Sequence, residues 1–251
     1  SALSFSRTDP LADLGATANL SVKFGLPLLS GSIEDRDWMD DLDPGELTNY
    51  SKHDAYLQGG TAFPVLLDFS GGITIPIASR VAIKILGSFS FMRFSWEARD
   101  GYKKYKDEFW IPKDTPGTGL TYEQHWFIFS PGLGVFWPFH RSLKADFSFF
   151  ISPLIYVEAL DTHLYTKVQY FDKMRWGLYL EPSLELTFSP NSYLSLVLHG
   201  NWRYITGARG NSTGVNMDTN VSTKFTNMAG AGYSVFDLGL FLKITLPGSP
   251  D

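Results

Sequence analysis

Apolar and polar residues alternate along most of this chain, the pattern of strands that are buried on one face. The clearest stretch is 143–155, where the odd positions are mostly apolar and Lys144, Asp146 and Ser148 occupy even positions. We expect eight strands, at 17–29, 60–69, 81–94, 126–139, 143–155, 177–188, 193–204 and 236–246. The pattern therefore predicts an all-β protein.

The connections between these strands differ in length. Short turns at 70–72, 140–142 and 189–192 alternate with long polar loops at about 30–55, 97–124, 159–175 and 206–231. Short turns at one end and long loops at the other are typical of an antiparallel transmembrane β-barrel. Charged residues such as Glu181 and Arg203 lie opposite faces of Leu and Phe, as expected for a polar interior and a lipid-facing exterior. We expect residues 1–251 to form a single outer-membrane barrel domain; a soluble β-sandwich is the less favoured alternative.

Composition narrows the class further. Aromatic residues make up 16% of the 251 residues, and no run of about eighteen apolar residues is present, which excludes a transmembrane helix. The chain has no cysteine, so disulfides and thiol catalysis are excluded. A net charge of −5 argues against nucleic acid as a partner.

Candidate chemistry is concentrated in an acidic stretch, Ile33–Asp54, and in the triplet Asp161-Thr162-His163. The acidic stretch contains an aspartate pair, Asp35 and Asp37. Taken alone, such a pair is more often a solvated loop or a weak calcium site, although the glycine of an EF-hand loop is missing. The sequence has neither a Gly-x-Ser-x-Gly elbow nor a His-Glu-x-x-His motif, so serine-hydrolase and zinc-protease chemistry have no support.

The run from Asp35 to His53 resembles the omptins, the outer-membrane barrel proteases of Gram-negative bacteria. Three further motifs are similar to that family: Phe94–Arg99, Asp161-Thr162-His163 and Gly230-Ala231-Gly232. The resemblance covers almost all of the chain from Asp35 onward. It implies a ten-stranded barrel, of which eight strands are legible here, in the bacterial outer membrane with its loops facing the exterior.

The resemblance also implies an endopeptidase that acts on polypeptides through an activated water, without a metal. Asp161 and His163 would form a dyad on one side of the cleft, and Asp35 and Asp37 would hold the water from the other side. A histidine titrates near neutral pH and suits a general base, and a carboxylate can orient it. His53 matches a family histidine near the site and is given a supporting role.

We expect no cofactor, although the resemblance implies that lipopolysaccharide binds the outer wall through basic residues and that activity can depend on it. Arg93 matches a position on the outer wall that binds it, and Lys173 matches another by a looser alignment. An interfacial arginine that simply reaches lipid headgroups remains an equal reading of Arg93.

Three features depart from the family's pattern. Ala159 stands where the family has an acid in its pocket for a basic residue, so the neighbouring Glu158 becomes the candidate for substrate binding. Strict alternation from Ile155 would point Asp161 and His163 outward, so we expect a bulge near Ala159. The chain is also short before Asp35, which predicts a segment missing at about 31–33; a chain cut at its front is the alternative.

Two other functions remain open at this point. A surface barrel without catalysis, such as an adhesin or binding protein, would keep the fold. A lipid-modifying barrel enzyme would need a catalytic serine or a calcium site that the sequence does not show.

Overall fold

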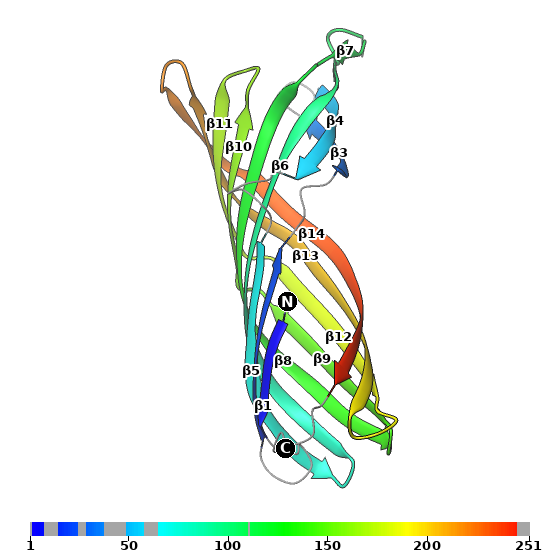
Figure 1. Ribbon diagram of the computed structural model, residues 1–251. Coiled ribbons are helices and arrows are strands. Elements are labelled where there is room, and N and C mark those ends of the chain that lie inside the picture. The colour runs from blue at the N-terminus through cyan, green and yellow to red at the C-terminus, as the bar shows by residue number, and fades with distance from the viewer. Residues whose placement is uncertain are drawn as a thin grey trace.

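The computed structural model describes residues 2–7, 15–24, 29–37, 49–57, 65–109 and 111–244, and for 2–7, 24, 29–37, 49 and 57 it describes the backbone alone. A single 14-stranded sheet forms the structure (Figure 1). The strands are β1 (Ala2–Arg7), β2 (Gly15–Phe24), β3 (Leu29–Asp37), β4 (Asn49–Leu57), β5 (Val65–Ala78), β6 (Val81–Tyr105), β7 (Lys113–Asp114), β8 (Thr118–His140), β9 (Leu143–Ser152), β10 (Ile155–His163), β11 (Val168–Arg175), β12 (Leu178–Phe188), β13 (Leu194–Asn216) and β14 (Ser222–Ile244).

The sheet is antiparallel, and several strands continue one another along its long axis. The strand order begins β1-β2-β5-β6-β8. Beyond β8 the sheet continues through β10 and β11 at the end that carries β3, β4 and β7, and through β9 and β12 at the opposite end. Both halves pair with the long β13, which pairs with β14. β4 pairs with the end of β6 that β5 leaves unpaired, and β3 pairs with β4.

Each of the eight expected strands overlaps an observed one: β2, β5, β6, β8, β9, β12, β13 and β14. Residues 25–28 and 60–64 of the expected strands lie outside the described part. The long loops were overestimated. β6 continues to Tyr105 and β8 begins at Thr118, and the other three stretches contain β3, β4, β10, β11 and the adjoining ends of β13 and β14. These strand ends were missed because they lack a simple apolar alternation, whereas ladder hydrogen bonds require no alternation.

The expected turn at 70–72 is wrong. β5 runs through these residues, and the turn to β6 lies at Ser79–Arg80. Gly72 is needed inside the strand because a Cβ there would come within 2.1 Å of the Ile85 carbonyl oxygen. The glycines therefore allow a close approach of two strands rather than a reversal of the chain.

The sheet curls so that its inner face forms a closed core. Lys23 on β2 and Asp237 on β14 form an ion pair at 3.2 Å, so the two ends of the strand order approach each other. Tyr233 on β14 donates a hydrogen bond to the Met92 sulfur on β6 at 3.3 Å, and its ring lies 5.9 Å from that of Trp126 on β8. β14 is far from β6 and β8 in the strand order, so the described residues wrap around a filled interior.

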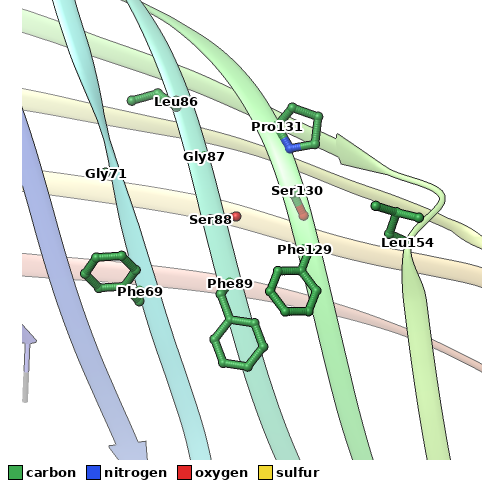
Figure 2. Close-up of a pocket in the computed structure, with 10 residues that line it drawn as sticks. All are labelled: Phe69, Gly71, Leu86, Gly87, Ser88, Phe89, Phe129, Ser130, Pro131 and Leu154. Carbon is green, nitrogen blue, oxygen red and sulfur yellow. The ribbon is translucent and has the colours of Figure 1, made fainter.

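The outer face is apolar over most of its length. Large exposed side chains cover it on β8, β9, β12, β13 and β14, among them Leu133, Phe147, Leu184 and Leu240. A hollow of about 590 Å³ lies on this face. Figure 2 shows Phe69, Phe89 and Phe129, which line it, side by side on three neighbouring strands. No titratable side chain lines it. None of the described residues belongs to a helix able to cross a membrane.

Candidate active site

The inner face of β10 carries the candidate dyad because of a one-residue irregularity at Pro153–Leu154. Phe150 pairs with Gly132 of β8, whereas Ile155 pairs with Ile128, so the β9–β10 side has one residue more. The side chains change face there: Ile151 is exposed, whereas Ile155 is buried. The bulge expected near Ala159 is therefore wrong in position, since β10 keeps an unbroken register from Ile155 to His163. Its expected effect is observed, because the odd positions of β10 turn inward.

Pairing across the sheet places the inward residues in cross-strand rows at the mouth, the end of the sheet that carries β3, β4, β7, β10 and β11. His163 lies opposite Val168 of β11, and Asp161 lies opposite Tyr170. Ala159 lies opposite Asp172, one position deeper. On the other side, β8 contributes Leu120, Tyr122 and Gln124 to the same three rows. β13 continues the rows with Asn216, Gly214 and Ser212.

Asp161 and His163 are in direct contact. The distance between Asp161 Oδ2 and His163 Nε2 is 3.0 Å, so Nε2 carries the proton that it donates to the carboxylate. Nδ1 is then the nitrogen able to accept a proton. Asp161 Oδ1 is buried and receives no hydrogen bond from a described residue. The edge of the Tyr170 ring packs on the imidazole, with 5.4 Å between ring centroids. The pair has the arrangement of an oriented general base.

Tyr122 lies beside the dyad and was not singled out from the sequence. Its hydroxyl accepts a hydrogen bond from Gln124 Nε2 at 2.8 Å, and Gln124 Oε1 accepts one from Trp126 Nε1 at 3.1 Å. Burial raises the pKa of Tyr122 to about 12, so its hydroxyl stays protonated at neutral pH. No motif could have revealed this residue, because only the register of β8 against β10 brings it to Asp161.

Asp172 is a second inward carboxylate that the sequence analysis missed. Burial raises the pKa of Asp172, the nearby Ser212 hydroxyl lowers it, and the negative charge of Asp161 raises it further. No described lysine or arginine forms an ion pair with Asp172; Lys167 pairs with Asp218 and Lys173 with Glu158. The position of Ala159 therefore lacks an acid, but the strand beside it supplies one.

Asp35 and Asp37 lie on β3, where the register places them opposite Ser51 and Asn49 of β4. β3 and β10 are found at the same end of the sheet (Figure 1), with β4, β6 and β8 between them in the strand order. Four strand spacings correspond to roughly 20 Å along a sheet, so Asp35 and Asp37 would face the dyad across the mouth only through the curl of the sheet. The side chains of both aspartates fall outside the described part, and their role stays a prediction.

His53 is buried on β4 and has a structural partner. Its Nδ1 donates a hydrogen bond to the backbone carbonyl of Asp100 at 2.7 Å. Asp100 and Gly101 interrupt the pairing of β6 with β4, and both have positive φ, 51° and 117°. His53 thus holds an irregular segment of β6 in place. Whether it also supports the dyad stays a prediction.

Three of the expected binding residues lie on the outer wall. The Glu158 carboxylate accepts a hydrogen bond from the Tyr156 hydroxyl at 2.6 Å and lies 3.8 Å from Lys173 Nζ. Arg93 Nε donates to Glu123 at 2.9 Å on the same wall. The irregularity at Pro153–Leu154 that turns Asp161 inward turns Glu158 outward, away from the dyad, and the substrate-binding role of Glu158 stays a prediction.

Among the side chains that the structure describes, no three His, Asp or Glu residues come together as a metal-ligand set. Asp161 and His163 provide two such groups, and the inward carboxylate of Asp172 lies in a different cross-strand row.

The sequence profile of the Omptin family matches residues 4–246. The chain belongs to the omptin family. Its structure also matches that of the outer membrane protease OmpT from Escherichia coli, with a TM-score of 0.75 and 20% sequence identity over 93% of this chain and 78% of that chain. No curated protein sequence matched the chain.

The match to OmpT shows that this omptin has the fold of an outer-membrane β-barrel. Its apolar outer face is then the lipid-facing surface, and the charged residues Arg93, Glu158 and Lys173 lie on the same wall. Family and fold together support an outer-membrane protease at the level of the family.

Proposed function

We propose that this omptin is an outer-membrane endopeptidase that hydrolyses peptide bonds with a water activated by His163. The contact between His163 Nε2 and Asp161 Oδ2, 3.0 Å on the inner face of the barrel mouth, is the observation that carries the proposal. An imidazole fixed in one tautomer by a carboxylate is suited to take a proton from water and later to give it to a leaving amine.

The reaction that we propose runs as follows. His163 Nδ1 takes a proton from the water, and the water oxygen attacks the carbonyl carbon of the scissile bond. The Asp161 carboxylate stabilises the imidazolium that forms. His163 then returns the proton to the amide nitrogen as the carbon–nitrogen bond breaks. The Tyr122 hydroxyl remains a donor for the negative charge on the substrate oxygen.

Asp35 and Asp37 complete the proposed site by holding the water from the opposite side. The family resemblance supports this role, and so does the location of β3 at the same end of the sheet as β10. We propose His53 as a supporting residue that keeps β4 and β6 in register, through its bond to Asp100.

Refolded protein with added lipopolysaccharide tests the proposal on a mixed peptide library. We expect wild type to cut, and His163→Ala and Asp35→Ala each to lose at least ~100-fold in kcat/KM. His140→Ala and Asp107→Ala are matched controls, since both residues are exposed outside the proposed site. A folded wild type that cuts nothing would instead favour a binding barrel, for which the alanine at position 159 leaves room.

We also propose lipopolysaccharide as a lipid partner on the outer wall. Arg93 and Lys173 lie on the outer wall, each beside a carboxylate, and long basic side chains on such a wall can reach lipid headgroups. Arg93→Ala and Lys173→Ala should each weaken activation by added lipopolysaccharide, whereas Lys144→Ala at the opposite end should not. Equal activity with and without the lipid in wild type would remove this part of the proposal.

A further inference from the structure

We propose that a hollow beside His163 is a subsite for an uncharged, apolar side chain of the substrate; this rests on the proposed peptidase function. The hollow has a volume of about 440 Å³ and lies at the mouth, over the ends of β11, β13 and β14. That volume is ample for one side chain, since pockets for whole small ligands begin near 300 Å³. The residues lining it are Val168, Tyr170, Gly214, Asn216, Thr219, Val221, Thr223 and Phe225.

The chemistry of the lining selects against charge. None of the lining residues is ionisable near neutral pH, and Tyr170 and Phe225 present two rings 6.2 Å apart. Gly214 lets both rings lie against β13, because a Cβ there would come within 3.1 Å of each. An apolar side chain entering this hollow exchanges water for aromatic surface, which stabilises binding in proportion to the area buried.

One polar group at the rim, the side-chain oxygen of Asn216, is already engaged. Asn216 Oδ1 accepts hydrogen bonds from the backbone nitrogens of Asp218 and Thr219, each at 3.0 Å, and from the Thr219 hydroxyl at 3.1 Å. These bonds cap the turn between β13 and β14. The side-chain oxygen of Asn216 therefore serves the turn rather than a polar ligand.

The hollow is formed before any substrate enters. Lys167 Nζ donates to both carboxylate oxygens of Asp218, at 3.0 and 2.9 Å, and the Lys167 carbonyl accepts from the Met217 nitrogen at 2.8 Å. These bonds tie the β10–β11 turn to the β13–β14 turn. A preformed wall spares the cost of ordering two turns when the substrate binds.

The location next to the dyad identifies which substrate residue the hollow accepts. Tyr170 lines the hollow and also contacts the His163 ring, at 5.4 Å between centroids. Consecutive Cα atoms of a peptide are 3.8 Å apart, so a carbonyl held for attack at His163 has a flanking side chain within reach of Tyr170. The hollow thus accepts one of the two residues that flank the scissile bond.

A peptide series tests the subsite. Each flanking residue is varied in turn among Leu, Phe, Ser, Asp and Lys, and kcat/KM is measured for wild type, Phe225→Ala, Val221→Asp and Phe236→Ala. Phe236 is the matched control, because it lies on the same strand, β14, but is 66% exposed on the outer face. We expect wild type to prefer Leu or Phe over Ser by about 10- to 100-fold at one position.

The variants should change that ratio in opposite ways. Phe225→Ala should lower the Leu-to-Ser ratio by about tenfold, Val221→Asp should shift the preference towards Lys, and Phe236→Ala should leave the ratio unchanged. A flat preference at both positions in wild type, or a ratio that neither pocket variant changes, would overturn the subsite.

Binding separates this inference from the peptidase itself. Fluorescence polarisation with the same peptides on His163→Ala reports occupancy of the hollow without cleavage. If wild type cuts no peptide but binding keeps a preference for Leu that depends on Phe225, the peptidase proposal fails and the subsite stands. If peptides are cut but neither binding nor cleavage depends on Phe225, the subsite fails alone.

Discussion

Arg203 of β13 reaches Asp68 of β5 through the interior of the barrel, with 2.7 Å between Nη2 and Oδ2. The same guanidinium donates from Nε to Glu181 of the adjacent β12 at 3.0 Å, and its side chain is only 6% exposed. β5 and β13 are not neighbours in the strand order. The contact therefore joins two walls of the barrel and fills the lumen with side chains.

Removal of Arg203 should destabilise the barrel strongly. Arg203→Ala leaves Asp68 and Glu181 buried without their cation, which costs about 3–5 kcal/mol for a pair of this kind. Urea unfolding in lipid vesicles measures the change. Lys23→Ala breaks an exposed ion pair with Asp237 and should cost no more than about 1 kcal/mol. Equal effects of the two substitutions would show that the contacts of Arg203 across the interior do not stabilise the barrel.

Asp161→Asn should keep the fold and lose most of the activity. The amide cannot stabilise an imidazolium, and it can hold His163 in the wrong tautomer, so we expect kcat/KM to fall by roughly 10²- to 10⁴-fold. Peptide hydrolysis measures the loss, and unfolding confirms that the barrel is intact. Asp107→Asn, an exposed aspartate outside the proposed site, serves as control for the substitution. Activity within a few-fold of wild type would exclude Asp161 from the mechanism.

Asp172→Asn should stabilise the protein at neutral pH. Burial and Asp161 raise the pKa of Asp172, so the folded state binds its proton more tightly than the unfolded state. Wild-type stability is therefore lost as pH rises from the unfolded pKa through the folded pKa, and the neutral amide avoids that loss. Unfolding at pH 7.5 and at pH 3.5 should show the advantage of Asn at the first pH and little at the second. An advantage that does not depend on pH would contradict this reading.

Gly101→Ala should disrupt the segment that His53 supports. Gly101 has φ of +117°, and a Cβ there would come within 2.1 Å of the Lys52 carbonyl oxygen. We expect a cost of about 1–3 kcal/mol or more, with faster hydrogen exchange in β4. Gly87→Ala is the matched control, since a Cβ at Gly87 meets nothing within 4 Å. Similar stability of the two variants would show that the strand irregularity is not needed.

The alternation of apolar and polar residues was enough to predict the all-β fold class and the position of the middle of each lipid-facing strand. Where one face meets lipid, as in 143–151 and 178–188, apolar side chains must alternate, so the pattern is written in the residues. The candidate dyad of Asp161 and His163 was also found in the sequence, because the triplet resembles the Asp-x-His pair of the family. Most of β10 and all of β11 were predicted as loop, because strands that meet water on both faces need no alternation of apolar and polar residues.

Which side chains face the mouth depends on the register of the assembled sheet. One additional residue at Pro153–Leu154 reverses the faces of β10, turning Asp161 inward and Glu158 outward, and no local pattern reveals where such a residue is accommodated. Tyr122, Asp172 and Phe225 join the site through the register of separate strands. Register depends on pairing between segments distant in sequence, so these neighbours could be found only once the sheet was assembled.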